Sequence, residues 1–395
     1  MIYLDVTSAV RSVINAGVQR SIRGLYRHFG PRAEVCPVRW DFSARRYTSL
    51  SARELGLLTN PFEKRTGPVS IPGFLGDIRD PGAVADRRTR ADRALPETFL
   101  TAGDVLLIPD LCWDSRIQAW PSLAKMPGHK IAVFHDAMPL RIRGQANSKD
   151  ELFAEYVRML AQLDLVICVS AEVQEDLTRL WREFGIVPKP TVVLRWPMPF
   201  PGNRPENPPN LAARRIIYVA RLRLRKNHLV LLDACEQLWS RDVAFSLDLI
   251  GMADALVDTS KILWRTARLR ARGRPVRWRR HISDEELDRA YRNCSFTVFP
   301  SQMEGFGFPV IESLWHRRPV ICGGNGAIGE IAREGGCRQV DQNDANELAA
   351  AMRELLTVPA TYERLCSETD TLAFRTWDDY GRDLHAVLEG APRAL

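Results

Sequence analysis

The stretch from residue 294 to residue 332 constrains the fold more than any other part of the chain. Its apolar, β-favouring runs at 296–299 and 319–322 predict two buried strands, and a glycine-rich turn follows each of them. After the first turn, Pro309 occupies the place of a first helical residue, where its fixed φ suits the helix and its missing N–H is not needed. Strand, turn and helix therefore occur twice in succession. This is typical of a parallel sheet, which binds ligands at the carboxyl ends of its strands.

The same alternation runs through both halves of the chain. Strand patterns occur at 2–6, 34–40, 104–108, 130–134, 163–169, 191–194, 215–220, 245–250 and 276–282. Helical patterns occur at 18–29, 148–163, 171–183, 227–240, 261–272, 284–293 and 377–389. Residues 197–210 hold six prolines and no periodicity, which indicates a linker. We therefore predict an α/β protein of two doubly wound, Rossmann-like domains that face each other across a cleft.

The predicted boundaries follow from these patterns. An N-terminal domain spans 1–199, a linker 200–213 and a C-terminal domain 214–375, and a final helical segment covers 376–395. A chain of 395 residues is long enough for two or three domains. Residues 41–100 include a long excursion, rich in proline, glycine and charge, whose role the pattern does not predict.

Composition limits the environment and the partners. The net charge is +7, and only seven of the 55 cationic residues are lysines, so arginine dominates. This balance is compatible with nucleic acid, anionic lipid or phosphorylated substrates, although a genomic base bias gives the same excess. The eight cysteines form no C-x-x-C pair, and no apolar run approaches about 18 residues. We expect a soluble, cytoplasmic protein with reduced thiols.

A run of cations follows the predicted strand 215–220. Arg221, Arg223, Arg225 and Lys226 occupy four of six positions between the end of that strand and the start of a helix. Cations at this edge of a sheet predict a phosphate site, and a solvated basic loop is the alternative.

Two glutamates flank the first glycine turn. Glu304 lies in the turn, and Glu312 lies early in the following helix, where the helix dipole favours a carboxylate. Carboxylates cannot bind phosphate but can accept hydrogen bonds from sugar hydroxyls, so the pair suggests that one holds a ribose and the other a transferred sugar. Helix-dipole complementarity for Glu312 and a surface position for Glu304 are the structural alternatives.

A polar pair, His135 and Asp136, follows the predicted strand 130–134 in the first domain. A polar pair at this end of a strand points to a ligand-binding face, with a purely structural histidine as the alternative. The sequence contains no Asp-x-Asp and no histidine pair with metal-ligand spacing, so we predict no metal. A leaving diphosphate would then be neutralised by Arg221, Lys226 and helix N-terminal amides.

Two further motifs keep other interpretations open. The spacing Gly324-x-Gly326-x-x-Gly329 matches the dinucleotide-binding fingerprint. However, it lies in the last βα unit of the domain and not in the first. A tight turn that allows close packing is the alternative explanation for these glycines. The segment from Lys261 to His281 holds eight arginines and two tryptophans. It could bind nucleic acid or anionic lipid, or form the solvated side of an edge helix.

Taken together, these motifs resemble the family 4 retaining glycosyltransferases. E-G-F-G-F-P-V-I-E at 304–312 is similar to that family's signature, with its two glutamates at the same spacing. V-A-R-L-R-L-R-K-N-H at 219–228 is similar to its Arg-x4-Lys diphosphate clamp, which falls on Arg221 and Lys226. N-A-G-V-Q-R at 15–20 and F-H-D-A-M-P at 134–139 resemble a subgroup that builds bacterial surface polysaccharides.

The resemblance implies a GT-B fold, in which the terminal helix crosses back to the first domain and the second domain binds most of the donor. It assigns the diphosphate to Arg221 and Lys226 and the ribose to Glu312. It assigns the sugar and phosphates to Glu304 with the backbone of Gly305, Phe306, Gly307 and Phe308. It places the base near Ile282, brings Gly17 to the diphosphate, and sets His135 and Asp136 at the reacting carbon.

The resemblance also implies a reaction. We expect transfer of a hexose, mannose or a 6-deoxyhexose such as rhamnose, from a nucleotide diphosphate sugar to a lipid-linked or growing polysaccharide. A GDP-sugar is the first expectation, without cofactor, metal or nucleic acid, and with peripheral attachment to the anionic inner face of the plasma membrane. The alternatives are a nucleotide-sugar epimerase of the same fold, an NAD(P)-dependent oxidoreductase that uses Gly324 to Gly329, and a non-catalytic binder that uses Lys261 to His281.

Overall fold

A computed structural model describes residues 1–11, 17–30, 34–59, 94–96, 98–112, 114–141, 148–198, 203–206, 208, 210–253, 257–280 and 282–390. Within it the chain divides into two compact units. The first comprises Met1–Trp196 together with Trp377–Leu395, and the second comprises Pro197–Thr376. The chain therefore leaves the first unit, builds the second and ends in the first.

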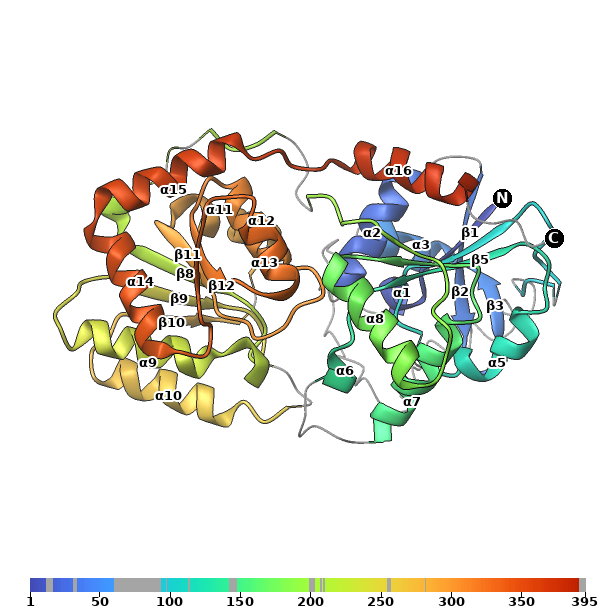
Figure 1. Cartoon of the computed structure of the whole chain (residues 1–395), viewed down its shortest axis with the longest axis horizontal. Coiled ribbons are helices and arrows are strands. Elements are labelled where there is room, and N and C mark those ends of the chain that lie inside the picture. Colours follow the sequence, from blue (N-terminus) through green and yellow to red (C-terminus); the bar gives the residue numbers. More distant parts are fainter. Residues whose placement is uncertain are drawn as a thin grey trace. The chain divides into compact units, whose positions relative to one another are not determined.

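The first unit is built on a seven-stranded sheet in the order β3-β2-β1-β4-β5-β6-β7 (Figure 1). The strands are β1 (Ile2–Asp5), β2 (Val35–Asp41), β3 (Arg46–Ser49), β4 (Val105–Ile108), β5 (His129–Phe134), β6 (Leu165–Cys168) and β7 (Thr191–Val193). All neighbours pair in parallel except β3, which runs antiparallel to β2 at the edge. Every residue of β4 and β6 is buried, as expected for strands covered on both faces.

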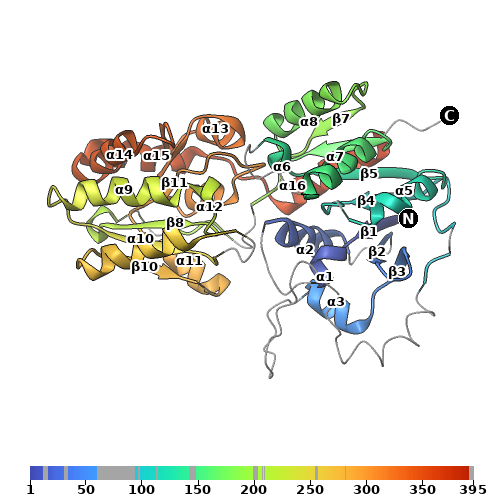
Figure 2. The same cartoon turned by 90° about the horizontal axis from the view of Figure 1, so that it is seen from below.

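Helices cover both faces of this sheet. Figure 2 shows α7 and α8 on one side and α1, α2 and α3 on the other. The helices are α1 (Thr7–Arg11), α2 (Gly17–Phe29), α3 (Ala52–Thr59), α5 (Arg116–Leu123), α6 (Met138–Arg141), α7 (Ser148–Leu160), α8 (Ala171–Glu183) and α16 (Trp377–Gly390). The terminal helix α16 packs on α2, where Gly24 makes room for the Trp377 ring, because a Cβ there would lie 2.1 Å from the indole.

The second unit is built on a six-stranded, fully parallel sheet in the order β10-β9-β8-β11-β12-β13. The strands are β8 (Arg215–Val219), β9 (Ser246–Ile250), β10 (Val276–Arg279), β11 (Phe296–Phe299), β12 (Val320–Gly323) and β13 (Cys337–Val340). Like β4 and β6, β11 and β12 are buried throughout, which explains their uninterrupted apolar patterns.

The helices of this unit cover the two faces of its sheet, with α9 and α10 on one face and α12 and α13 on the other (Figure 1). They are α9 (His228–Trp239), α10 (Ser260–Ala271), α11 (Asp284–Asn293), α12 (Phe308–Trp315), α13 (Gly326–Ala332), α14 (Ala345–Thr357) and α15 (Pro359–Thr371). The helix expected at 284–293 is confirmed as α11, and a capping box begins it, in which Ser283 and Glu286 exchange hydrogen bonds.

The strand orders place one switch point in each sheet. In the first unit β1 lies between β2 and β4, and in the second β8 lies between β9 and β11, so the direction of winding reverses between β1 and β4 and between β8 and β11. In doubly wound sheets ligands bind outside the carboxyl ends of the two strands at such a point. A ligand-binding site is therefore expected at the loops after β8 and β11 in the second unit, or at those after β1 and β4 in the first unit.

Several details differ from the sequence-based expectations. The edge strand β3 was not predicted, and Phe308, not Pro309, is the first residue of α12. Although it is charged, Arg23 of α2 is 1% exposed and donates to the carbonyl oxygens of Ala9 and Leu57, because α1 and α3 cover its side of the helix. Asn15, Ala16, His281, much of the 41–100 segment and part of the 197–210 segment lie outside the described residues.

Candidate functional site

The cationic loop after β8 is held against the neighbouring strand. The Ala220 N–H donates to the Ile250 carbonyl and the Leu222 N–H to the Met252 carbonyl. Gly251 permits this approach, since it has φ +145° and a Cβ there would lie 2.2 Å from the Ala220 oxygen. The loop ends in a 3-10 turn, Leu224–Lys226, and α9 begins directly after it.

The loop after β11 meets the cationic loop at Glu304. The Lys226 ammonium pairs with Glu304 Oε1, and Arg225 donates to the same oxygen at 3.1 Å and to the Met303 carbonyl at 2.8 Å. The Ser301 hydroxyl donates to Glu304 as well. Hydrogen bonds thus join the loop after β8 to the loop after β11 at the switch point, between residues that are 75 to 79 positions apart in the chain.

Two cations share one carboxylate here, so this trio carries a net positive charge. Burial lowers the pKa of Lys226 to about 8, although Glu304 acts in the opposite direction. Burial acts to raise the pKa of Glu304, but attraction to Lys226 and Arg225, with their hydrogen bonds, outweighs it and holds that pKa below its ordinary value. At neutral pH both partners are ionised, and a bound anion would meet a charged lysine.

Glu312 lies in a different, fully buried environment. It is 2% exposed, and one carboxylate oxygen accepts a hydrogen bond of 2.8 Å from the Tyr291 hydroxyl. Tyr291 belongs to an apolar cluster with Ile217 and Ile250, against which Ile282 packs. Glu312 and Ile282, the residues expected near ribose and base, therefore border the same group of side chains.

The four residues between the glutamates form the start of α12. Gly307 has φ +104°, a conformation that other residues rarely adopt, and it lies directly before the helix. The rings of Phe306 and Phe308 contact each other edge to face, and Gly305 is buried. Neither Gly307 before α12 nor Asn227 before α9 caps its helix through a side chain. First-turn N–H groups of this kind commonly bind phosphate or carboxylate.

The glycines of the second turn have packing roles. A Cβ on Gly329 would lie 2.3 Å from the Gly324 carbonyl oxygen, and one on Gly324 would lie 2.7 Å from Gln339 Oε1. The helix after this turn begins at Gly326, so Gly326 and Gly329 belong to α13 and not to the turn. Tight contacts account for Gly324 and Gly329 without a dinucleotide.

The remaining predicted residues lie in the first unit. His135 directly follows β5, is 6% exposed, and its Nε2 lies 2.7 Å from the Pro109 carbonyl oxygen. Asp136 accepts a hydrogen bond from the Met138 N–H at the start of α6. Gly17 is the exposed first residue of α2, and its carbonyl accepts from the Ser21 hydroxyl.

The structure thus brings Lys226 and Glu304 into contact and places Arg221, half-buried, in the same loop. The sequence reasoning missed Ser301 as a partner of Glu304 and Tyr291 as a partner of Glu312. Ser301 could have been found from its place two residues after β11. The Tyr291 contact had no local signal, because 21 residues separate it from Glu312.

The described part of the chain contains neither a metal-binding cluster nor a membrane-spanning helix. No group of three or more His, Cys, Asp or Glu side chains there could hold a metal ion. No helix among those residues is both long and apolar enough to span a bilayer.

Comparison with known families finds a match within the second unit. Residues 200–370 match the family described as glycosyl transferases group 1. The serotype-specific mannosyltransferase WbdA of Escherichia coli is 30% identical over 221 residues, which are 51% of this chain and 27% of that protein. The O-antigen chain mannosyltransferase B of Escherichia coli is 28% identical over 141 residues, 35% of this chain and 36% of that protein. The matched segments thus span about a third or less of these relatives.

Solved structures support the fold over the whole chain. The sucrose-phosphate synthase of Thermosynechococcus elongatus superposes with a TM-score of 0.66 at 17% identity, covering 98% of each chain. Anabaena Alr3699/HepE, in complex with UDP and glucose, superposes with a TM-score of 0.65 at 14% identity, covering 98% of this chain and 99% of that one. The two doubly wound units therefore have the GT-B fold.

Proposed function

Residues 200–370 form a domain of the group 1 glycosyl transferase family, and from this premise we propose that the chain is a retaining glycosyltransferase that uses a nucleotide-sugar donor. The observation that carries the proposal is the contact between Lys226, Arg225 and Glu304 at the β8–β11 switch point. It offers cations for a diphosphate and a carboxylate for sugar hydroxyls at one sheet edge.

The proposed roles follow the chemistry of each group. Arg221 and Lys226 neutralise the diphosphate, together with N–H groups at the starts of α9 and α12. Glu304 and the backbone of residues 305–308 bind the transferred sugar and the phosphates. Glu312, at the edge of the apolar cluster around Tyr291, binds the ribose, and Ile282 borders the base. Gly17, His135 and Asp136 are proposed as the first unit's contributions to the donor and the reacting carbon.

The proposed reaction needs no protein nucleophile. The acceptor hydroxyl oxygen forms the new bond to the anomeric carbon while the bond from that carbon to the diphosphate oxygen breaks, on the same face of the sugar. The departing phosphate oxygen takes the proton of the acceptor hydroxyl. Cations that stabilise the charge on this oxygen lower the barrier, because they act where negative charge develops.

The sugar and acceptor are proposed from the relatives. WbdA and the O-antigen chain enzyme are both named mannosyltransferases. Mannose, or a 6-deoxyhexose such as rhamnose, is therefore the proposed sugar, with a GDP-sugar as the first donor to test. The proposed acceptor is a lipid-linked or growing surface polysaccharide, met at the inner face of the plasma membrane. HepE was solved with UDP, so uridine donors belong in the same screen.

The test begins with a thermal-shift screen of GDP-, UDP- and dTDP-sugars, followed by transfer assays with the donor that stabilises the chain. We expect Lys226→Met and Arg221→Ala to weaken donor binding about 10- to 100-fold, because a hydrogen bond to a charged group contributes ~1.5–3 kcal/mol. Arg382→Ala is the matched control, since Arg382 is a 72% exposed arginine on α16 and should leave donor binding unchanged.

Three results would count against the proposal. Unchanged donor affinity in both Lys226→Met and Arg221→Ala would remove the proposed site. Release of an epimerised sugar without an acceptor would favour a nucleotide-sugar epimerase. Binding of NAD(P)H, with no response to any nucleotide sugar, would favour an oxidoreductase.

A further inference from the structure

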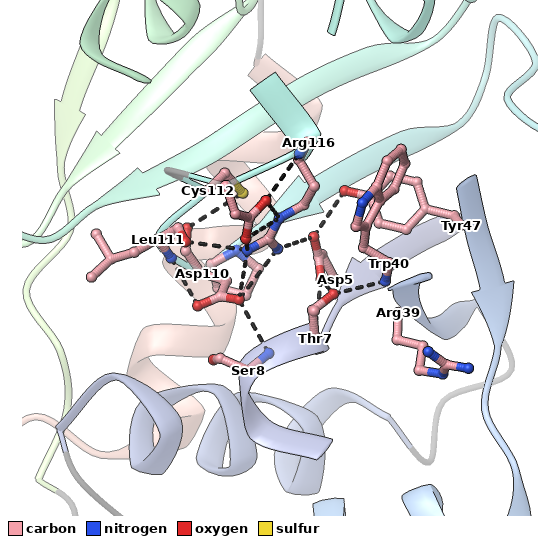
Figure 3. A network of polar contacts seen from close by, with 12 residues as sticks. Asp5, Thr7, Ser8, Arg39, Trp40, Tyr47, Asp110, Leu111, Cys112 and Arg116 are labelled. Carbon is pink, nitrogen blue, oxygen red and sulfur yellow. Dashed lines mark hydrogen bonds and ion pairs between the residues drawn. The ribbon is translucent and has the colours of Figure 1, made fainter. Parts of the chain in front are cut away.

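A buried ionic cluster lies at the switch point of the first unit, where β1 and β4 end (Figure 3). Arg116, the first residue of α5, is 4% exposed and donates to three carboxylates. Its guanidinium lies 2.8 Å from Asp5 at the end of β1, 3.2 Å from Asp110 after β4 and 2.6 Å from Asp114. Such a cluster is costly to bury, so its position beside a ligand-binding edge calls for a reason beyond stability.

Asp110 accepts four hydrogen bonds within the cluster. Its Oδ2 accepts from both terminal nitrogens of Arg116 at 3.2 Å and from the Ser8 N–H at 3.1 Å. Its Oδ1 accepts from the Leu111 N–H at 2.8 Å, and Arg116 also donates to the Leu111 carbonyl. These bonds hold the Asp110 side chain and the backbone of Leu111 in place. The peptide that joins Pro109 to Asp110 lies directly before them in the chain.

The carbonyl of this peptide holds His135. The Pro109 oxygen lies 2.7 Å from His135 Nε2, and since a carbonyl only accepts, Nε2 carries the hydrogen. The His135 ring also stacks on the Trp196 ring, with the ring centroids 6.0 Å apart and an angle of 20° between the ring planes. Burial lowers the pKa of His135, so the ring is neutral at pH 7 and Nδ1 is unprotonated. Among the described residues Nδ1 has no hydrogen-bond partner.

We propose that Asp110 and Arg116 are positioning residues that hold His135 in the tautomer with hydrogen on Nε2, so that Nδ1 accepts a hydrogen bond from a hydroxyl of the sugar substrate. This inference rests on the proposed role of His135 as a substrate contact. The chain of contacts runs from Arg116 to Asp110, through the Pro109 carbonyl, to the imidazole. The ionic cluster thereby fixes the orientation of the His135 imidazole, although its charged side chains make no hydrogen bond to that ring.

The tautomer can be observed directly in the full-length protein labelled with 15N-histidine. Long-range 1H–15N spectra distinguish a protonated from an unprotonated ring nitrogen, and the spectrum of His135→Gln assigns the signals of His135. We expect hydrogen on Nε2 in the wild type. Asp110→Asn keeps the shape of the side chain but loses the charge that Arg116 binds. In this variant we expect both tautomers of His135. We also expect kcat to fall about tenfold, while the donor KM changes less than about twofold.

Tyr47→Phe is the matched control within the same cluster. The buried Tyr47 hydroxyl donates to Asp5 Oδ2 at 2.8 Å (Figure 3), and among the described residues it has no hydrogen bond to Asp110 or Pro109. This variant should lose stability without a change in tautomer or in kcat. A purely structural cluster would make Asp110→Asn behave like Tyr47→Phe, and that result would overturn the proposal.

The tautomer measurement also separates this inference from the proposed function. Hydrogen on Nδ1 in the wild type would overturn the inference even if Asp110→Asn failed to fold and even if sugar transfer were found. Conversely, absence of transfer from every donor would remove the proposed function, while the tautomer shift in Asp110→Asn would still show that the cluster positions His135.

Discussion

At the scale of single residues, Lys226 gives the candidate site a pH dependence. Burial lowers the pKa of this lysine to about 8, from an ordinary value of 10.5. Below pH 8 the ammonium is charged and can bind a diphosphate, and above pH 8 an increasing fraction of it is neutral. We therefore expect the donor Kd to be flat from pH 6.5 to 7.5 and to rise up to about tenfold per pH unit above pH 8. Isothermal titration calorimetry across this range measures it.

Lys226→Arg provides the comparison, because a guanidinium stays charged throughout this range. The donor Kd of Lys226→Arg should be nearly independent of pH up to 9.5, even if the larger guanidinium group weakens donor binding at every pH. If the wild type and Lys226→Arg show the same rise above pH 8, another group is titrating and Lys226 is not the anion ligand.

Individual residues were predictable where the motif was local. Lys226 and Glu304 were named from two short segments, and the structure brings them together. Contacts formed by tertiary packing left no such signal, as with Tyr291 and Glu312 and with the burial of Arg23 by α1 and α3. Local periodicity predicts the direction of a side chain on its own helix but not what later packs against it.

At the scale of elements, the start of α12 depends on one glycine. Gly307 has φ +104°, and a Cβ there would also come within 3.3 Å of the Ile331 side chain. We expect Gly307→Ala to cost about 1–2 kcal/mol of stability and to weaken donor binding as well, because the first turn of α12 shifts. Denaturant unfolding and donor titration measure the two effects.

Gly273→Ala separates strain from function in this comparison. Gly273 has φ +74° after α10, and no atom lies within 4 Å of a Cβ built there. Its substitution should cost a similar amount of stability and leave the donor Kd unchanged. Equal loss of donor affinity in both variants would mean that general destabilisation, and not the α12 start, is responsible.

Elements were predictable where period and cap signals agreed. The central strands β4, β6, β11 and β12 were found because both of their faces are buried, which makes them short apolar runs between turns. The helical pattern at 284–293 matches the bounds of α11, which a capping box begins. The strand β3 was missed because R-Y-T-S is short and alternates weakly, and its pairing with β2 depends on Tyr47 being buried against residues elsewhere in the unit.

At the scale of the whole molecule, the chain ends in the unit where it began. Trp377 and Tyr380 of α16 pack with Trp196, the last residue before the chain enters the second unit; the ring centroids of Trp196 and Tyr380 are 5.0 Å apart. Because Trp196 also stacks on His135, the same aromatic group joins the terminal helix to a candidate site residue. Periodicity predicted a helix at 377–389, but its packing partners Trp196 and Gly24 lie 181 and 353 residues earlier and left no local signal.

This arrangement predicts two separable unfolding transitions in calorimetry. A donor nucleotide at a hundredfold excess over Kd should raise the transition of the second unit, by about 2.7 kcal/mol, and identify it. Trp377→Ala should lower the other transition, because it removes a half-buried indole that packs on Gly24, Trp196 and Tyr380. We expect a loss of about 2 kcal/mol, less than the ~3–5 kcal/mol of a fully buried tryptophan, or roughly 4–8 °C.

Trp264→Ala is the control for this experiment, since Trp264 lies on α10 of the second unit and is 62% exposed. It should leave both transitions in place. A single transition that Trp377→Ala and nucleotide move together would show that the chain unfolds as one cooperative body. In that case α16 would stabilise the second unit as much as the first, because neither unit could unfold without the other.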